Sequence, residues 1–246
     1  MKVAIISDIH GNLEALMAIE KDMLSQGVER IYCLGDVVGY GPFPGKCLQW
    51  TVAKGIMVLK GNHEYGVCNQ DEIRERFNRY AFEAIQFSGK QLSDDEIIYI
   101  DNLPLTAVVQ ELDFSLSHSS FWSPEYWVYV QDAGAAKRDL GVMSTRIGFL
   151  GHTHIPFVFG SEKGLCRVLP DRFLLNNNER FIINVGSVGQ PRDGDCRASY
   201  GILEYDDDGS IRFDLRRVSY DIFATEWAMV EFGLPFSLHS RLFEGK

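Results

Sequence analysis

Short apolar runs of strand length recur along the chain, and they constrain its fold more than any other feature of the sequence. The alternation of such runs with helical patterns through about residue 60 is typical of parallel β–α–β units. Closely spaced runs between about residues 157 and 217 favour antiparallel pairing instead. We therefore expect an α/β sandwich. The clearest runs cover residues 3–6, 31–34, 56–59, 114–116, 147–150 and 181–183.

Helical patterns with recognisable ends lie between these runs. The first begins at Asn12, a suitable N-cap, and ends at Gly27, a residue type that commonly terminates helices. Another begins at Ser93, whose spacing to Glu96 predicts a capping box, and it must end before Pro104. Further amphipathic patterns cover about residues 71–92 and 221–232. The last of these segments suits packing either on the sheet or against a partner subunit, so a homodimer is left open.

Composition and charge exclude several classes of protein. The chain has 34 acidic and 24 basic residues and a net charge of −10, so it lacks the positive field needed to bind nucleic acid in bulk or an anionic membrane. No apolar run approaches the roughly 18 residues that span a bilayer. The start of the chain lacks the pattern of a secretory signal. The five cysteines are odd in number, widely spaced and without a C-x-x-C pair, which argues against both a disulfide framework and a zinc knuckle. We expect a cytoplasmic protein with a single domain over residues 1–246.

Residues with reactive or metal-ligating side chains directly follow the strand-like runs. Five of the six histidines have such positions, and two aspartates and an asparagine accompany them. In open α/β sheets, ligands bind beyond the carboxyl ends of the strands, so these side chains are expected to converge. In chain order they are Asp8, His10, Asp36, Asn62, His63, His118, His152 and His154.

This set of donors suits a site for Mn²⁺, Fe or Zn²⁺. The lack of thiolates argues against a structural zinc site, and the many imidazoles argue against Mg²⁺ alone. Extended backbone at Asp8-x-His10 and His152-x-His154 would place both members of each pair on one face. Any single motif of this kind is more often a cap or a turn than a metal site. The interpretation as a metal site is supported by the whole set of motifs in this order, and not by any one of them.

The ordered motifs resemble those of the calcineurin-like metallophosphoesterase superfamily, which are D-x-H, G-D, G-N-H-[DE], H and G-H-x-H. Residues 184–195 and 198–200 resemble its small prokaryotic phosphodiesterase branch, which includes YfcE-like enzymes and relatives of diadenosine-tetraphosphate hydrolases. The resemblance implies two mixed sheets flanked by helices and the activity of a metal-dependent phosphoric ester hydrolase. Glu64 departs from the aspartate that is commoner after Asn-His, a difference that bears on the orientation of His63.

The resemblance also implies roles for the individual residues of the site. His63 matches the catalytic histidine of the family, which is not a metal ligand, and it would protonate or stabilise the leaving oxygen. Two divalent ions, Mn, Fe or Zn, would hold a bridging hydroxide that attacks phosphorus, and their charge would attract phosphate to an acidic protein. One ion would be held by Asp8, His10 and His154 and the other by Asn62, His118 and His152, with Asp36 bridging both.

Residues outside these motifs are candidates for substrate binding. In the resemblance, the loop with Arg192 faces the metal site, so Arg192 is expected to contact a distal phosphate, with a surface arginine in a turn as the alternative. Ser187 and Gln190 are further candidates in this loop, and Asn12 is a helix cap that is also placed to touch phosphate. Residues 121–129 hold five aromatic side chains, which either stack on a nucleobase or form a packed lid or subunit interface. Packing is the preferred interpretation of that segment.

Three functions are compatible with these residues. The preferred one is a dinuclear phosphoesterase that hydrolyses phosphodiesters or nucleotide polyphosphates, with diadenosine tetraphosphate or a related dinucleotide as substrate. A phosphomonoesterase, including a protein phosphatase, would use the same metal core. The third is a non-catalytic scaffold on the same fold, which has no reason to keep His63 together with the full ligand set. The expected partner is a small phosphorylated substrate, a nucleotide.

Overall fold

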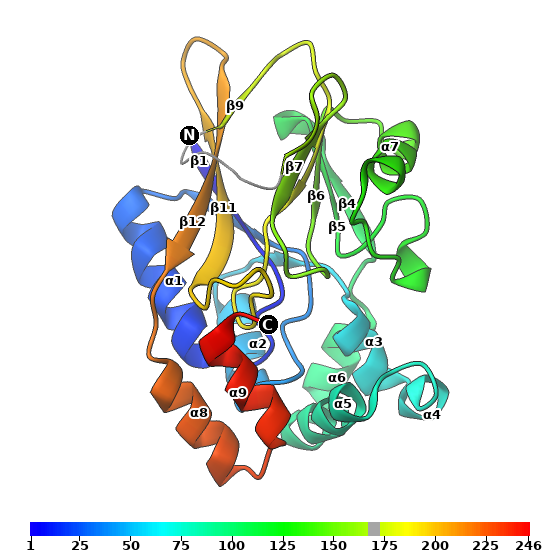
Figure 1. Ribbon diagram of the computed structural model, residues 1–246, viewed down its shortest axis with the longest axis vertical. Coiled ribbons are helices and arrows are strands. Elements are labelled where there is room, and N and C mark those ends of the chain that lie inside the picture. Colours follow the sequence, from blue (N-terminus) through cyan, green and yellow to red (C-terminus); the bar gives the residue numbers. More distant parts are fainter. Residues whose placement is uncertain (167–172) are drawn as a thin grey trace.

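The computed structural model describes residues 1–166 and 173–246 of the chain. Within these residues the strands form two mixed sheets of six strands each, which stand beside one another in the upper part of Figure 1. The first sheet has the order β3-β2-β1-β11-β12-β9 and consists of β1 (Lys2–Ile6), β2 (Arg30–Cys33), β3 (Met57–Val58), β9 (Phe173–Leu175), β11 (Ala198–Tyr205) and β12 (Ile211–Val218). The second has the order β4-β5-β6-β10-β7-β8 and consists of β4 (Thr106–Val109), β5 (Phe114–Ser117), β6 (Ile147–Leu150), β7 (Phe157–Gly160), β8 (Gly164–Cys166) and β10 (Phe181–Asn184).

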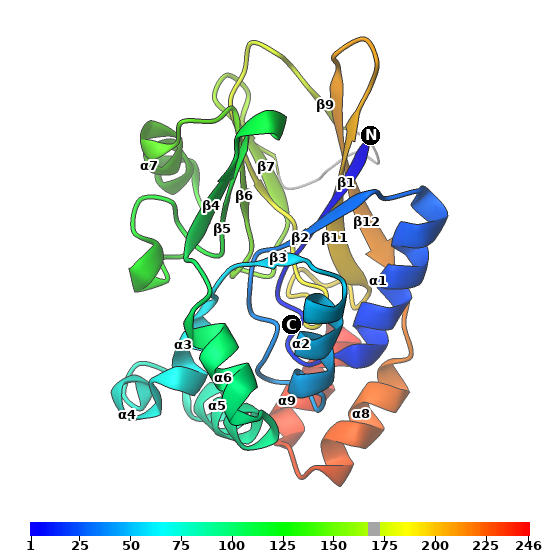
Figure 2. The same cartoon turned by 180° about the vertical axis from the view of Figure 1, so that it is seen from behind.

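Helices cover the outer faces of the sheets and fill the lower part of the molecule (Figures 1 and 2). They are α1 (Leu13–Gln26), α2 (Pro44–Ala53), α3 (Asn62–Cys68), α4 (Gln70–Ile73), α5 (Arg79–Gln91), α6 (Asp94–Asp101), α7 (Ala133–Val142), α8 (Ile222–Glu231) and α9 (Phe236–Glu244). Two short 3-10 turns cover Gln110–Leu112 and Pro124–Tyr126. Among the described residues, no helix combines the length and the apolar character that crossing a membrane requires.

Alternating side chains define an inner and an outer face for each sheet. In β1, Val3 and Ile5 are buried in the core between the sheets, whereas Ala4 and Ile6 are buried together with side chains of α1. In β10, Ile182 packs against α7, while its two neighbours face the core between the sheets. The layers are therefore helices, sheet, sheet and helix. This arrangement confirms the expected α/β sandwich.

Both sheets contribute the carboxyl ends of parallel strands to one edge. β1 is parallel to β2 and β2 to β3, while β5 is parallel to β6 and β6 to β10. The loops after β1 and β10 then join the two sheets, since the N–H of Val188 donates to the C=O of Ser7 (3.0 Å) and that of Gly189 to the C=O of Asp8 (2.9 Å). The polar loops of the sequence motifs consequently meet where the sheets come together.

Several expected helix boundaries are confirmed. The side chain of Asn12 caps α1, and Gly27 ends it in the left-handed conformation with a φ of 71°. The capping box of Ser93 and Glu96 is present at the start of α6. The pattern over residues 221–232 corresponds to α8.

The prediction of one continuous helix over about residues 71–92 is wrong. The structure has the short α4 and then α5, separated by residues 74–78. The side chain of Asn78 accepts a hydrogen bond from the N–H of Ala81 (3.0 Å), so it starts a new helix. The amphipathic pattern also leaves one aromatic side chain outside the core, because Tyr80 is exposed whereas Ile73 and Ala81 are buried. The sequence patterns did not predict α2, α3, α7, α9 or β4.

Candidate metal centre

The loops after β1, β2 and β6 adopt the left-handed backbone conformation at five of the candidate metal ligands. Asp8, His10 and Asp36 have φ values of 54°, 49° and 52°, and His152 and His154 have values of 63° and 60°. Non-glycine residues rarely adopt this region, which costs roughly 1 to 3 kcal/mol each and is concentrated at functional sites. The expectation of extended backbone at both histidine-containing pairs is therefore wrong. Left-handed turns, not the pleat of a strand, direct these side chains toward the site.

Two glycines of the motifs are required by close packing of the backbone. A Cβ on Gly151 would lie 1.9 Å from Oγ of Ser7, and a Cβ on Gly61 would lie 2.2 Å from Oδ1 of Asp36. Any larger residue at either position would push apart the loops that carry the carboxylates.

Asp8, His10 and His154 form the first candidate cluster of donor atoms. Nε2 of His154 lies 3.2 Å from Oδ1 of Asp8 and 3.1 Å from Nε2 of His10. Nε2 of His10 lies 3.8 Å from the same oxygen of Asp8. Ligands bound roughly 2.1 Å from one ion stand about 3.0 to 3.4 Å apart at right or tetrahedral angles. The shorter two distances fit that spacing.

Asp36, His118 and His152 form the second candidate cluster, and Asn62 lies beside it. Nε2 of His118 is 3.3 Å from Oδ2 of Asp36 and 3.1 Å from Oδ1 of Asn62. The same oxygen of Asp36 is 3.7 Å from Nε2 of His10, which belongs to the first cluster. One carboxylate oxygen thus lies between two sets of donors.

Backbone carbonyls orient the four histidines of these clusters. One ring nitrogen of each is bonded to a carbonyl, and such bonds fix the tautomer of ligating histidines. The acceptors are the carbonyls of Val38 for His10, Leu34 for His118, Trp127 for His152 and Gln190 for His154.

Three polar atoms of the first cluster lack a hydrogen-bond donor among the described residues. When the rings of His10 and His154 are neutral, their Nε2 lone pairs face each other at 3.1 Å with no proton between them. Oδ1 of Asp8 is buried and has no hydrogen-bond partner among the described residues. A cation would satisfy all three atoms, so the residues present fit a bound divalent ion.

The buried charges favour the protonation states that metal binding requires at every one of these donors except His118. Burial acts to raise the pKa of Asp8 and Asp36, but nearby histidines outweigh it and hold both pKa values well below the ordinary range. Burial lowers the pKa of three of the four cluster histidines, to about 3 for His152. Burial also opposes the charge of His118, but Asp36 raises its pKa to about 9. Metal binding would therefore release a proton from His118.

Comparison with known families agrees with this geometry. Residues 1–208 match the calcineurin-like phosphoesterase superfamily domain. The chain belongs to the calcineurin-like phosphoesterase superfamily. It is accordingly a metal-dependent phosphoric ester hydrolase, and divalent metal ions are its cofactors. The interpretation as a non-catalytic scaffold is not supported.

Relatives of this phosphoesterase align over most of its length. It is 36% identical to the uncharacterized protein MJ0912 of Methanocaldococcus jannaschii, over 99% of this chain and 98% of that protein. The phosphodiesterase YfcE of Escherichia coli is 26% identical, over 84% of this chain and 89% of that protein. The crystal structure of a metallophosphoesterase from Sphaerobacter thermophilus is 36% identical, covers 100% of this chain and 99% of its own, and superposes with a TM-score of 0.86.

His63 lies at the start of α3, next to the donor atoms of the two candidate clusters. The backbone N–H of His63 donates to Oδ1 of Asp36 (2.8 Å). The centroid of the His63 ring is 4.7 Å from that of His10 and 4.5 Å from that of Tyr40. Burial, only partly offset by Asp36, lowers the pKa of His63 to about 4, so the ring is neutral at pH 7. Its donor atoms also group with those of His10 and Asp36. The catalytic role of His63 stays a prediction.

Glu64 of this phosphoesterase organises the loop that carries Asp36. Its Oε2 accepts hydrogen bonds from the N–H groups of Asp36 and Gly61, both at 2.8 Å, and its Oε1 accepts one from Val38 (3.1 Å). Burial and the charge of Asp36 raise the pKa of Glu64 to about 7. The longer side chain that departs from the family pattern therefore binds backbone N–H groups around Asp36.

The four residues expected to bind substrate gather beside the first cluster. Asn12 caps α1, as expected, and its amide nitrogen also donates to the backbone of the 187–190 loop (2.9 Å). The hydroxyl of Ser187 donates to the C=O of Asp8 (2.9 Å). Nη2 of Arg192 donates to Oε1 of Gln190 (2.9 Å), while Nε of Arg192 and Nε2 of Gln190 are buried without a partner among the described residues. Their contact with substrate stays a prediction.

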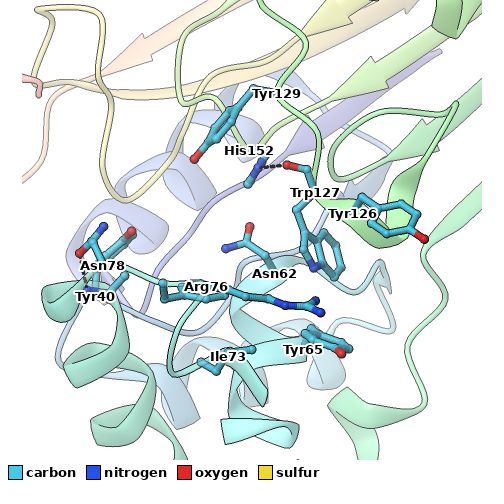
Figure 3. A pocket seen from close by; sticks show the side chains of 12 residues that line it. Tyr40, Asn62, Tyr65, Ile73, Arg76, Asn78, Tyr126, Trp127, Tyr129 and His152 are labelled. Atoms are coloured by element: carbon cyan, nitrogen blue, oxygen red, sulfur yellow. Dashed lines mark hydrogen bonds between the residues drawn. The ribbon is translucent and has the colours of Figure 1, made fainter. Parts of the chain in front are cut away.

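A pocket of about 430 Å³ opens beside the second cluster (Figure 3). Asn62 and His152 line it, so it is continuous with the metal centre. Tyr126, Trp127 and Tyr129 also line it, and the ring of Tyr129 stacks on that of His152 with centroids 4.2 Å apart. The other lining residues are Tyr40, Tyr65, Ile73, Arg76, Phe77, Asn78 and Ala81.

The aromatic segment 121–129 divides between the two expected roles. Phe121 packs against the buried cluster beneath α7. Trp122 is 56% exposed and is not among the residues that line the pocket. Trp127 and Tyr129 face the pocket instead, beside His152. Packing is therefore observed for Phe121, whereas contact of Trp127 and Tyr129 with a ligand stays a prediction.

Sequence reasoning missed Tyr40, Tyr65 and Arg76. Tyr40 has a φ of 45° and contacts the ring of His63. Its position in a Gly-Tyr-Gly triplet, two residues beyond the second motif, was a usable signal. Tyr65 and Arg76 have no comparable signal. Arg76 lies in the break between α4 and α5, and that break brings it to the pocket (Figure 3).

Proposed function

We propose that this phosphoesterase hydrolyses phosphodiesters or nucleotide polyphosphates with two divalent ions, Mn, Fe or Zn. The observation that most supports two ions is Oδ2 of Asp36, which lies 3.3 Å from Nε2 of His118 and 3.7 Å from Nε2 of His10. Such ions supply a hydroxide for attack on phosphorus and neutralise the charge of the reacting phosphate. In this proposal Asp8, His10 and His154 hold one ion, Asn62, His118 and His152 hold the other, and Asp36 bridges them.

The neighbouring side chains would bind and orient the phosphate. Because the ring of His63 is neutral at pH 7, we assign it an N–H hydrogen bond to the leaving oxygen. Glu64 holds Asp36 in position by accepting hydrogen bonds from the backbone N–H groups of Asp36 and Gly61. His63 is thus the proposed catalytic residue, and Glu64 is a positioning residue.

The pocket supports a nucleotide as the substrate class. A space of about 430 Å³ bordered by Tyr126, Trp127 and Tyr129 suits a planar base, because aromatic faces stack on nucleobases. The pocket adjoins Asn62 and His152, so a phosphate attached to that base would reach the metal centre. Likeness to a protein named as a phosphodiesterase supports cleavage of a diester bond. Diadenosine tetraphosphate represents this class of substrate.

The test is product analysis of Mn²⁺-loaded protein with diadenosine tetraphosphate, 2′,3′-cyclic AMP, bis(4-nitrophenyl) phosphate and 4-nitrophenyl phosphate. We expect cleavage of at least one diester or polyphosphate, and a His63→Ala variant should lower kcat by about 10²- to 10⁴-fold. His239→Ala is the matched control, since His239 lies in α9 and bonds to Glu226 instead of the metal centre. It should keep full activity.

Two outcomes would contradict the proposal. Cleavage of 4-nitrophenyl phosphate alone would establish the phosphomonoesterase alternative. Cleavage of a diester at an unchanged rate in the His63→Ala variant would show that His63 is not a catalytic residue.

A further inference from the structure

Tyr40 lies in a turn that is built closely against His10 and His63. A Cβ on Gly39 would lie 2.1 Å from Nδ1 of His63, and a Cβ on the glycine after Tyr40 would lie 2.3 Å from the carbonyl oxygen of His10. Tyr40 itself has a φ of 45°, a strained conformation of the kind that is concentrated at functional sites. The Gly-Tyr-Gly triplet, residues 39–41, therefore leaves no room for a side chain other than that of Tyr40.

Hydrogen bonds and packing hold this triplet in place. The N–H of Gly39 donates to Oγ of Ser88 in α5 (3.0 Å). The N–H of Gly41 donates to the C=O of His10 (2.8 Å). The side chain of Tyr40 is buried in one cluster with side chains of α5, α8 and α9, and it also lines the pocket of Figure 3. Three helices thus limit the movement of this ring.

The ring of His63 lacks a hydrogen bond that would orient it at Nδ1. This atom is buried, has no partner among the described residues, and faces the backbone of Gly39. The four cluster histidines differ, because one ring nitrogen of each is bonded to a backbone carbonyl. Catalytic bases are commonly oriented by a third group, so the orientation of His63 requires another source.

Aromatic rings surround His63 in place of such a hydrogen bond. The centroid of its ring lies 4.5 Å from that of Tyr40, with 59° between the planes, and 4.7 Å from that of His10, with 72° between the planes. Phe77 is farther away, at 5.8 Å. Aromatic pairs have centroids about 4.5 to 7 Å apart, so the contact with Tyr40 is at the short end of this range. Rotation of the His63 ring would bring its edge into the ring of Tyr40.

This packing directs Nε2 of His63 to the metal centre. Because Nδ1 faces Gly39, Nε2 is the nitrogen that remains for the site. A ring nitrogen of His63 lies within 4.8 Å of donor atoms of His10 and Asp36. The N–H that we assign to the leaving oxygen is then on Nε2, and its direction depends on the orientation of the ring.

We propose that Tyr40 is a positioning residue for His63, because its ring fixes the orientation of the imidazole where a hydrogen-bonded partner is missing. Side chains whose rotamers are locked by packing keep a site in its productive geometry. The inference rests on the proposed catalytic role of His63. It adds to the site a residue that lies outside all five sequence motifs.

The first test is the crystal structure of metal-free wild type, Tyr40→Leu and Tyr40→Phe. Leucine removes the aromatic ring but keeps an apolar side chain in the buried cluster. We expect the His63 ring to change its orientation, or to adopt more than one, in Tyr40→Leu and to keep the wild-type orientation in Tyr40→Phe. An unchanged His63 ring in Tyr40→Leu would overturn the proposal. Tyr40→Met gives the same readout if the leucine variant does not fold.

The second test is steady-state kinetics of the enzyme at saturating Mn²⁺. Tyr40→Leu should lower kcat about 10- to 100-fold and change KM less than about twofold, whereas Tyr40→Phe should stay within about threefold of the wild type. Tyr80→Leu is the matched control, because Tyr80 is 48% exposed in α5 and is not among the residues that line the pocket. An effect of Tyr40→Leu on KM alone would overturn the proposal.

A double-mutant cycle shows whether Tyr40 acts through His63. In a His63→Ala background, Tyr40→Leu should lower kcat by less than about twofold further. The full loss in that background would overturn the proposal, because Tyr40 would then act independently of His63. A displaced His63 ring in crystals of Tyr40→Leu, together with hydrolysis of no substrate by the wild type, would support the positioning of His63 while contradicting the proposed function.

Discussion

Backbone groups hold the side chains of the candidate metal ligands in place. Each of the four cluster histidines uses one ring nitrogen on a backbone carbonyl, so its other nitrogen is directed before any ion binds. Asp36, the proposed bridging residue, is held in a comparable way, because Glu64 accepts hydrogen bonds from the backbone around it. Preorganisation of this kind limits the entropy lost when the ions bind.

Replacement of Asp36 should affect both ions. Asp36→Ala removes the only carboxylate placed between the two clusters in the described part of the chain, so we expect the affinity for Mn²⁺ to fall by more than about 100-fold. Metal content after equilibrium dialysis, measured by mass spectrometry, checks this. Asp207→Ala, at an exposed turn residue, is the control. Unchanged metal content in Asp36→Ala would show that Asp36 is not a ligand.

Segments without a metal ligand form much of the pocket wall. The break between α4 and α5 contributes Arg76 and Phe77, and the segment after β5 contributes Tyr126, Trp127 and Tyr129. We therefore propose that substrate choice depends on these two segments, whereas the metal chemistry depends on the loops at the strand ends.

Trp127 and Trp122 provide a matched pair of substitutions for this idea. Trp127→Ala should raise KM for dinucleotides about tenfold and that for bis(4-nitrophenyl) phosphate much less, because a stacking contact is worth roughly 1 to 3 kcal/mol per base. Trp122→Ala should leave both values unchanged, since Trp122 is outside the pocket lining. Steady-state kinetics with both substrates check this. Equal effects of Trp127→Ala on the two substrates would favour the packing interpretation.

Asp22 fastens α1 to the first sheet. Its carboxylate accepts hydrogen bonds from the hydroxyl of Tyr200 (2.7 Å) and from two nitrogens of Arg216 (3.0 and 3.1 Å). Burial opposes its ionisation, but these hydrogen bonds outweigh burial and lower the pKa of Asp22. Asp22→Asn should therefore reduce the free energy of unfolding at pH 7 by about 1 to 3 kcal/mol.

The pH dependence of this effect follows from the direction of the shift. The contribution of Asp22 is complete above its unfolded pKa of about 3.9 and is lost as the pH falls through the lower folded value. Urea unfolding of wild type and Asp22→Asn should show a constant difference from pH 8 to about pH 4 and a smaller one below. A difference that grows on acidification would contradict this account.

At the scale of the whole molecule, the two sheets share one buried core. Side chains of β1 from the first sheet and of β5, β6 and β10 from the second are buried in the same cluster. The organisation as one domain over residues 1–246 stays a prediction. We expect chelator-treated protein to unfold in a single transition, with coincident curves from circular dichroism and tryptophan fluorescence. Two separated transitions would indicate two domains.

A homodimer also stays a prediction at this scale. Phe223 and Trp227 of α8 and Phe236 of α9 are 72%, 69% and 74% exposed, so apolar side chains are available for a partner surface. Light scattering coupled to size-exclusion chromatography should give twice the chain mass of 27.9 kDa. Phe223→Ser together with Trp227→Ser should shift the protein to monomer. A monomeric wild type at micromolar concentration would remove this prediction.

Some parts of this molecule could be predicted from its sequence because they depend on local interactions. Strand-length apolar runs, the capping residues Asn12 and Ser93, and polar motifs directly after strands all act within a few residues. The convergence of the motif residues then follows from the geometry of parallel strands. The break at residues 74–78 was missed because Asn78, a residue that also fits inside a helical pattern, caps a new helix there.

The sequence by itself determined which residues are candidate metal ligands, their order along the chain and the sheet edge at which they gather. Only the tertiary structure decided that Asp36 lies between two clusters and that residues 121–129 divide between core and pocket. The physical reason is that these relations arise from side-chain packing and backbone hydrogen bonds between segments far apart in the chain. Periodicity and spacing along the sequence carry no record of such contacts.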